Sequence, residues 1–310
     1  MPDTVLVTGA SGFLGQAMVA ALVADGHRVV GTFRNGDPTA IDGVSWRRCD
    51  LASRAEVSAL LAEERPTHLV ALAWHMGPGN QQAVENYRWI GPSIDLLMDF
   101  AGNGGQRVVM CGSCREYVWG DDAPLCEESS PLAEAPPYGH AKAALWQVFG
   151  PLCQELGLSG AWARPFFLYG PAEPAHRLVP DVILSLLDGR EAACSSGTQR
   201  RDYLHVGDVA SAVLTLMNSD LQGAVNIGAG EAIALKDIVL EIGRQIGRED
   251  LIRLGARPDR PDDPPVIIAD TRRLSDELGW KPEIPLEAGL RQTIDWWRAR
   301  HDTARKEKAS

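Results

Sequence analysis

Short apolar runs alternate with amphipathic segments along the first half of the chain. Residues 4–8 form a β-branched run that ends in a glycine, and residues 12–24 then carry apolar side chains at helical spacing. The first pattern predicts a strand and the second a helix. Further strands are expected near 28–33, 44–49, 67–73 and 106–111, and further helices near 53–64, 80–101 and 138–156. Strands separated by helices predict an α/β fold, a doubly wound parallel sheet with helices on both faces.

The alternation breaks up after Pro165, where proline and glycine become frequent. We expect a smaller C-terminal lobe there, with helices near 235–246 and 286–299, while an apolar helix near 206–218 returns to the main domain. The expected division is residues 1–165 for the main domain, joined by 201–228; residues 166–200 and 229–300 for the lobe; and residues 301–310 for a flexible polar tail.

Composition and charge narrow the class of protein. The chain has 310 residues, of which 45% are hydrophobic, enough to bury a large core. Its formal net charge of -11 offers no basic surface for a nucleic acid, so we expect none as a partner. No apolar run approaches the roughly 20 residues that span a bilayer, and the start of the chain lacks the pattern of a secretory signal. We therefore expect a cytoplasmic protein with no membrane partner.

The six cysteines are scattered along the chain. Cys111 and Cys114 form a C-x-x-C pair, a spacing found in redox and zinc sites, but no second ligand pair of matching spacing follows. A protein of this size needs no disulfides to hold its core together. We expect free thiols and no metal site.

A glycine-rich turn joins the first expected strand to the first expected helix. In this position glycines permit a tight turn, let the backbone approach a pyrophosphate, and direct the amides of the helix N-terminus at the anion. The turn therefore predicts a dinucleotide cofactor. The residues expected to contact it are Gly9, Ser11, Gly12, Phe13, Leu14 and Gly15.

The end of the second strand selects the cofactor in such folds, because an acid there binds the ribose 2′-hydroxyl and an arginine accommodates a 2′-phosphate. Neither Thr32 nor Phe33 is acidic, and Arg34 follows at once. This favours NADP(H) over NAD(H), the alternative being that Arg34 is a solvated surface charge. Asp50, just after the third strand, is expected to meet the adenine amino group.

A second motif opens the helix expected at 138–156. Tyr138 and Lys142 are four residues apart and so share one helix face. A nearby ammonium favours phenolate, which lowers the tyrosine pKa toward a range where the side chain can exchange a proton with a substrate oxygen. The strand at 106–111 leads to Ser113, whose hydroxyl is expected at the carboxyl edge of the sheet, where doubly wound folds bind ligands.

With these motifs, the chain resembles the extended short-chain dehydrogenase/reductases, the nucleotide-sugar epimerase/dehydratase superfamily with a Rossmann fold, over nearly its full length. The matching text is TGASGFLG at 8–15, Asp50-Leu51, Ala71-Leu72-Ala73, Asn86, Ser113, Tyr138-x-x-x-Lys142, Arg164-Pro165, Tyr169-Gly170-Pro171, RDYLHVGD at 201–208, Asn226-Ile227-Gly228, Ala269-Asp270 and Leu278-Gly279-Trp280.

The resemblance implies roles for individual residues. Tyr138 is expected to be the acid/base, Lys142 to hold the nicotinamide ribose and lower the tyrosine pKa, and Ser113 to bind the reacting oxygen. Arg201 and Arg260 are expected on the substrate diphosphate, although Asp262 stands where the family often has glycine. Further cofactor contacts are expected from Leu51, Ala73 and Pro165. The resemblance also implies a substrate-binding role for the lobe and a homodimer packed through the helices near 80–101 and 138–156.

Departures from the family pattern narrow the reaction. Sugar 4,6-dehydratases follow their catalytic hydroxyl with an Asp-Glu pair, whereas Cys114 and Arg115 follow Ser113 here. Epimerase-reductases that make fucose nucleotides place a cysteine and a histidine where this chain has Arg115 and Arg177. Cys114 and His176 are each one position away and would serve only if the alignment shifts by one residue. Cys114, Arg115 and Arg177 are accordingly candidate substrate contacts.

With dehydration and coupled epimerisation disfavoured, the reaction that the sequence predicts is hydride transfer alone. The leading hypothesis is an NADPH-dependent reductase of a nucleoside-diphospho-4-keto-6-deoxyhexose. The alternative is a nucleotide-sugar 4-epimerase that keeps NAD bound. A non-catalytic, redox-sensing member of the fold is a third possibility, disfavoured because a sensor needs the glycine turn but not an acid/base.

Overall fold

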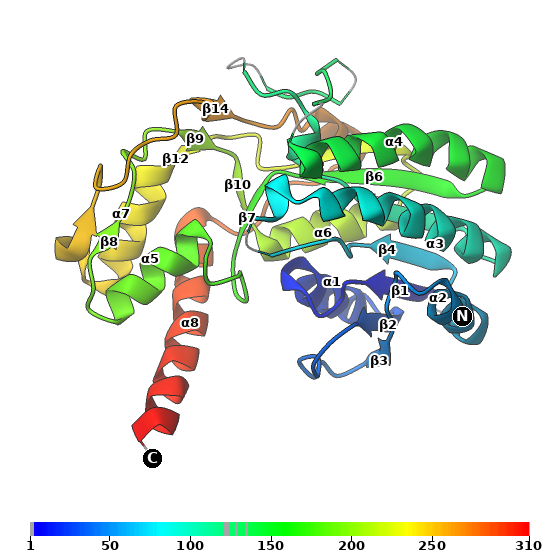
Figure 1. Cartoon of the computed structure of the whole chain (residues 1–310), viewed down its shortest axis with the longest axis horizontal. Coiled ribbons are helices and arrows are strands. Elements are labelled where there is room, and N and C mark those ends of the chain that lie inside the picture. Colours follow the sequence, from blue (N-terminus) through cyan, green and yellow to red (C-terminus); the bar gives the residue numbers. More distant parts are fainter. Residues whose placement is uncertain (1–2, 78, 121–123, 128, 134–135, 310) are drawn as a thin grey trace.

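The computed structural model describes residues 3–309 apart from 78, 121–123, 128 and 134–135, and it has a larger and a smaller part (Figure 1). The larger part is built on a parallel sheet that has seven strands among these residues. In spatial order they are β3 (Val44–Arg48), β2 (Arg28–Phe33), β1 (Thr4–Thr8), β4 (His68–Ala71), β5 (Arg107–Cys111), β6 (Ser159–Pro165) and β11 (Gly223–Ile227). The strand order reverses between β1 and β4, which is where open α/β sheets bind ligands.

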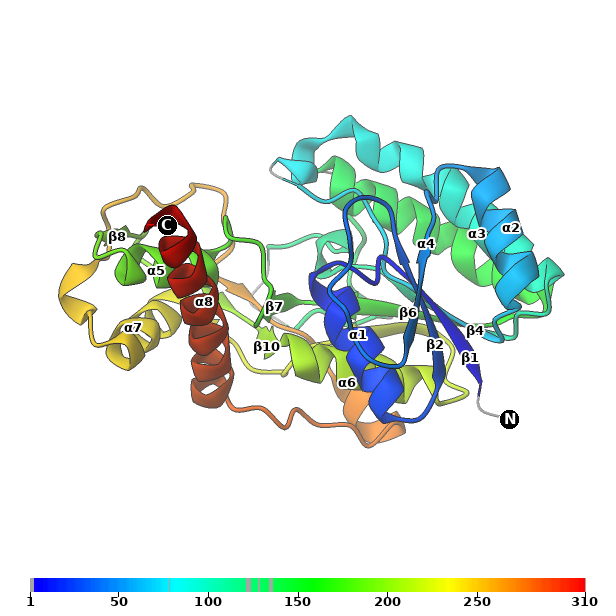
Figure 2. The ribbon, with the colours of Figure 1, turned by 90° about the horizontal axis from the view of Figure 1, so that it is seen from below.

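Helices cover both faces of this sheet (Figures 1 and 2). On one face lie α1 (Phe13–Ala24) and α6 (Val206–Met217), and on the other lie α2 (Arg54–Glu64), α3 (Ile90–Gly102) and α4 (Pro137–Leu156). Each face has its own apolar cluster, because parallel strands are buried on both sides and carry side chains of both layers. The doubly wound fold expected from the sequence is confirmed.

The smaller part is a lobe with three helices packed on one another around a separate apolar cluster. They are α5 (Leu178–Leu187), α7 (Leu235–Ile246) and α8 (Leu286–Ala309). The paired strands β7 (Phe167–Tyr169) and β10 (Tyr203–His205) connect it to the main sheet. Short strands complete it: β8 (Ala192–Ala193) with β13 (Ile252–Arg253), and β9 (Arg200–Arg201) between β12 (Ile233–Ala234) and β14 (Val266–Ile267).

Several boundaries differ from those expected. The stretch expected to be a flexible tail continues α8 to Ala309, because its alanines, lysines and arginines favour helix and no glycine or proline interrupts them. The helix expected from residue 80 begins only at Ile90, so that Pro92 lies in its first turn, where proline is tolerated. Leu274 and Trp280, within the stretch assigned to the lobe, pack in the cluster of α1 and α6.

Within 201–228, α6 and β11 pack in the larger part. Strand β9 pairs with strands of the lobe, and β10 pairs with β7 of the connection. Over the described residues, no helix has both the length and the apolar character needed to cross a membrane.

Candidate active site

The turn between β1 and α1 is shaped by close backbone contacts. Gly9 has φ 69°, and a Cβ there would lie 2.9 Å from the backbone of Ala73 on the neighbouring β4 side. A Cβ at Gly15 would overlap the carbonyl oxygen of Gly9, so only glycine lets α1 approach the strand this closely. Gly12 begins α1 without a side-chain cap, which leaves the amides of the first turn available to an anion. The turn thus fits the pyrophosphate of a dinucleotide.

The residues expected to select the cofactor lie at the carboxyl edge of the sheet. Arg34 is exposed directly after β2, and its carbonyl oxygen accepts a hydrogen bond from Arg48 Nε at 3.2 Å. Asp50 follows β3, where its carboxylate accepts the backbone N–H of Ala52 at 3.1 Å. Leu51 and Ala73 line one small pocket at this edge together with Thr8, Ala71 and Trp89. Pro165 is the last residue of β6, further along the same edge.

Ser113, Tyr138 and Lys142 come together at the adjacent part of this edge. Ser113 follows β5, and Tyr138 lies in the first turn of α4 next to Pro137, with Lys142 one turn later. The hydroxyl of Ser113 lies near the Tyr138 phenol and favours its ionised form. Lys142 Nζ donates to the carbonyl oxygen of Cys111 at 2.6 Å. The tertiary structure therefore gathers the three side chains that the sequence grouped by pattern alone.

Burial shifts both ionisable groups of this trio. Burial raises the pKa of Tyr138 above its usual value, and the nearby Ser113 hydroxyl opposes this only in part. The Lys142 amine contacts the Cys111 carbonyl and the Trp74 ring. Burial lowers the pKa of Lys142 to about 8.

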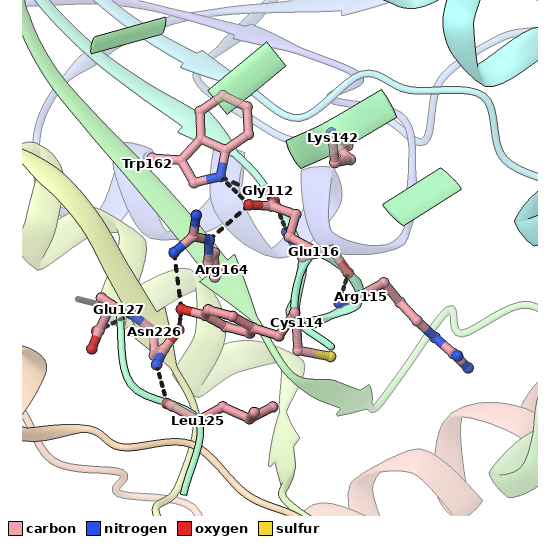
Figure 3. A network of polar contacts seen from close by, with 12 residues as sticks. Gly112, Cys114, Arg115, Glu116, Leu125, Glu127, Lys142, Trp162, Arg164 and Asn226 are labelled. Carbon is pink, nitrogen blue, oxygen red and sulfur yellow. Dashed lines mark hydrogen bonds and ion pairs between the residues drawn. The ribbon is translucent and has the colours of Figure 1, made fainter. Parts of the chain in front are cut away.

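A buried polar network holds the segment that carries Ser113 (Figure 3). Its centre is Glu116, a carboxylate with no exposed surface at the end of the short 3-10 helix η3 (Cys114–Glu116). Glu116 accepts hydrogen bonds from the Ser113 backbone N–H at 2.7 Å, from Trp162 Nε1 at 3.0 Å and from Arg164 Nε at 2.7 Å. Because the indole and the guanidinium both come from β6, the network ties the serine segment to the sheet.

The network continues toward β11. Arg164 Nη1 donates to the Tyr117 hydroxyl at 2.9 Å, and that hydroxyl donates to Asn226 Oδ1 at 2.8 Å. A Cβ at Gly112 would overlap Trp162 Nε1, so glycine is needed where the chain passes the indole. Ser113 is therefore placed by contacts with two strands of the main sheet.

The expected substrate contacts lie in different environments. Arg201 is 3% exposed, and its Nη2 lies 2.8 Å from Asp263 Oδ1. Arg260 is exposed on the loop between β13 and β14. Arg177 is the exposed N-cap residue of α5. Cys114 is buried against Tyr117 and other apolar side chains, and burial raises its pKa to about 12.

Two functional candidates were missed in the sequence. Trp74, directly after Ala73, covers the Lys142 amine, and nothing in the local pattern marks it. Glu116 had a signal, because Ser113-x-x-Glu116 is the pattern of a capping box, and the structure forms both of its hydrogen bonds.

Comparison with known proteins identifies a family and several relatives of the chain. A profile of the NAD dependent epimerase/dehydratase family matches residues 5–228. One relative is the dTDP-4-dehydro-6-deoxy-D-allose reductase of Streptomyces bikiniensis, 26% identical over 320 residues that cover 95% of this chain and 96% of the relative.

Solved structures of similar fold include two UDP-glucose 4-epimerases. The enzyme of Thermus thermophilus in complex with NAD has a TM-score of 0.83 at 25% identity and covers 95% of this chain and 99% of its own. The enzyme of Stenotrophomonas maltophila, with bound NAD and formylated UDP-arabinopyranose, has a TM-score of 0.85 at 26% identity, covering 97% and 99%. With the family profile spanning most of the chain, this protein belongs to the NAD-dependent epimerase/dehydratase family.

Proposed function

We propose that the chain catalyses the NADPH-dependent reduction of a nucleoside-diphospho-4-keto-6-deoxyhexose to the 4-hydroxy sugar. The nicotinamide supplies the hydride when it is bound, and residues of the chain supply the proton and orient the ketone. The observation that carries the proposal is the placement of Tyr138 near Ser113 and Lys142 in a buried site, where burial raises the tyrosine pKa. A phenol that keeps its proton at neutral pH suits a donor to an oxygen that gains negative charge.

Ser113 would orient the keto oxygen toward Tyr138, since its hydroxyl already meets the phenol and its backbone is held by Glu116. Lys142 would bind the nicotinamide ribose from the same helix. Arg201 and Arg260 would hold the diphosphate, because the forked donors of guanidinium match phosphate oxygens. The Streptomyces bikiniensis relative, named as a reductase of a dTDP-linked 4-keto sugar, supports this choice of substrate class.

The alternative is a nucleotide-sugar 4-epimerase that retains NAD. The two UDP-glucose 4-epimerases of similar fold favour it, and both were solved with NAD. Such an enzyme uses the same trio of residues, first as base and then as acid. A non-catalytic sensor is less favoured, because it would not need a serine, a tyrosine and a lysine brought together.

A labelled cofactor separates these functions. NADPH carrying deuterium at nicotinamide C4 is incubated with a panel of nucleotide-linked 4-keto sugars, and the product is examined by mass spectrometry and NMR. The proposal expects loss of absorbance at the nicotinamide band and one deuterium at C4 of the sugar. Interconversion of 4-hydroxy sugars without added cofactor, with NAD released on denaturation, would establish the epimerase instead.

The tyrosine variant assigns the proton donor. Tyr138→Phe should lower turnover by about 10²–10⁴-fold while leaving NADPH affinity nearly unchanged, because only the proton donor is removed. Tyr203→Phe, a phenol of the lobe, is the matched control and should retain much more activity. Wild-type turnover by Tyr138→Phe would remove this residue from the mechanism.

We also propose a homodimer formed through α3 and α4. These two helices lie side by side on one face of the sheet (Figures 1 and 2), and each carries a large exposed apolar side chain, Met98 and Val148. Light scattering of wild type and of Met98→Glu/Val148→Glu tests this, since charges on the face should shift the dimer toward monomer.

A further inference from the structure

Arg115 and Arg201 each lie over one of two neighbouring aromatic rings, those of Trp119 and Phe167. The guanidinium carbon of Arg115 lies 3.9 Å from the centre of the Trp119 ring. The rings of Trp119 and Phe167 are 6.1 Å apart, and the guanidinium carbon of Arg201 lies 5.8 Å from the Phe167 ring. Arg115 belongs to the segment of the catalytic serine, whereas Arg201 belongs to β9 of the lobe. The stack therefore spans the boundary between the two parts of the molecule.

Three arginines are near neighbours at this boundary. Arg201 and Arg260 both act electrostatically on Arg115, as does the carboxylate of Asp263, which forms an ion pair with Arg201. Arg201 Nη2 forms a buried ion pair with Asp263 Oδ1 at 2.8 Å, without full hydrogen-bond geometry. Among the residues that the structure describes, none accepts a hydrogen bond from the Arg115 guanidinium.

A guanidinium that stacks on an indole keeps its edge free. Its five N–H donors lie in the plane of the group, so stacking on Trp119 leaves them available to an anion with several oxygens. A donor that has no acceptor in the protein can bind a ligand oxygen without giving up an existing hydrogen bond. A diphosphate offers these donors more acceptor oxygens than a single carboxylate does.

We propose that Arg115 is a third arginine of the diphosphate site and that it couples diphosphate binding to the position of the Ser113 hydroxyl. The proposal rests on the proposed function, in which the substrate is a nucleoside-diphospho sugar. It assigns to Arg115 a role that the acid/base trio does not fill.

The coupling follows from the backbone of the same residue. The backbone N–H of Arg115 donates to Ser113 Oγ at 3.2 Å. A Cβ at Gly139 would overlap the carbonyl oxygen of Arg115, so the first turn of α4, which also contains Tyr138, packs directly on this peptide. If a diphosphate fixes the Arg115 side chain, the Arg115 backbone is fixed as well. That backbone contacts the Ser113 hydroxyl and the helix turn that carries the Tyr138 hydroxyl.

The test compares nucleoside diphosphates with monophosphates. UDP, TDP and GDP, and the matching monophosphates, are titrated calorimetrically into the NADPH-loaded full-length enzyme and its variants. Arg115→Met should weaken the preferred diphosphate by about 10–100-fold, the equivalent of one charge-assisted hydrogen bond, and change the monophosphate by no more than about twofold. Arg257→Met, an exposed arginine of the lobe paired with Asp181, is the matched control and should change neither.

Kinetics test the coupling. At saturating nucleotide sugar, Arg115→Met should have a lower kcat as well as a higher KM, whereas a residue that only binds substrate would change KM alone. Arg115→Lys keeps the charge without the fork and should show a smaller loss of both. Circular dichroism and NADPH affinity establish that each variant is folded. If Arg115→Met does not fold, the same measurements on Arg115→Lys provide the test.

The outcomes separate the two levels of the proposal. If wild type prefers no diphosphate over its monophosphate, the proposed function itself fails. If wild type prefers the diphosphate and both Arg115 variants keep this preference, the assignment of Arg115 to the diphosphate site is overturned. A lost preference with unchanged kcat would overturn the coupling to Ser113.

Discussion

Lys142 Nζ lies 3.7 Å from the centre of the Trp74 ring, so an indole face covers the amine while the Cys111 carbonyl accepts its hydrogen bond. Trp74 is itself held by its Nε1, which donates to Asn86 Oδ1 at 2.8 Å. A ring face favours a cation, whereas burial disfavours it. Because the pKa of Lys142 is lowered to about 8, burial is the stronger effect.

This arrangement predicts an alkaline limb in the pH profile. The ammonium form of Lys142 is lost as the pH rises through about 8, so kcat/KM should fall there. Trp74→Leu removes the π face and should move the limb to lower pH by about 0.4–1.5 units, the equivalent of a cation–π contact of about 0.5–2 kcal/mol. Trp74→Phe keeps a ring and should move it less. Trp296→Leu on α8 is the control, and a limb that moves upward in Trp74→Leu would show that the ring acts by excluding water.

Arg34 predicts the cofactor preference. It is exposed immediately after β2, at the edge where the ribose of a dinucleotide is expected. Arg34→Ala should weaken NADPH relative to NADH by about 10–100-fold, since one charge-assisted hydrogen bond to the 2′-phosphate is lost. Fluorescence titration of both cofactors measures this, with Arg190→Ala on the lobe surface as the matched loss of charge. Equal weakening of NADPH and NADH would leave the preference to other residues.

Glu116 predicts a large effect on stability. Its ion pair with Arg164 is buried on both sides, with side chains 0% and 1% exposed. Glu116→Gln leaves the guanidinium without its charge partner, and the free energy of unfolding should fall by about 3–5 kcal/mol. Glu241→Gln, whose partner Arg244 is exposed, should cost less than about 1 kcal/mol. Urea unfolding of the three proteins measures both losses, and similar values for the two variants would mean that the network contributes little.

The identities of Arg115 and Arg177 predict reduction without epimerisation of neighbouring carbons. Epimerisation beside a ketone needs groups that exchange carbon-bound protons with solvent, and arginine stays protonated at neutral pH. Arg115 and Arg177 occupy the two family positions, and burial holds the pKa of Cys114 at about 12, which keeps its thiol protonated. In deuterated water with unlabelled NADPH, the carbons flanking the reduced centre should gain no more deuterium than in an enzyme-free control.

Mass spectrometry of the product measures the deuterium at these carbons. Enzyme-dependent deuterium that disappears in Cys114→Ala or His176→Ala would show that the alignment is shifted by one residue and that the enzyme is an epimerase-reductase.

Local patterns in the sequence were enough for much of the fold. Periodicity alone identified the strands from β1 to β5 and helices such as α1, α4 and α6, because each element repeats its own apolar spacing. The glycine turn and the Tyr138–Lys142 spacing are likewise local patterns, and the structure brings both to the carboxyl edge of the sheet. Element ends were less certain where neighbouring residues favoured either state, as at the C-terminal end of α8.

Contacts between distant segments depend on the tertiary structure. Glu116 and Arg164 are 48 positions apart, and they meet because β5 and β6 are neighbours in the sheet. Trp74 follows β4 and reaches Lys142 on α4, while Arg115 and Arg201 approach each other across the boundary between sheet and lobe. Local spacing indicated the candidate residues for the chemistry. Their partners, and the directions of their pKa shifts, follow from strand order and burial, which no local spacing encodes.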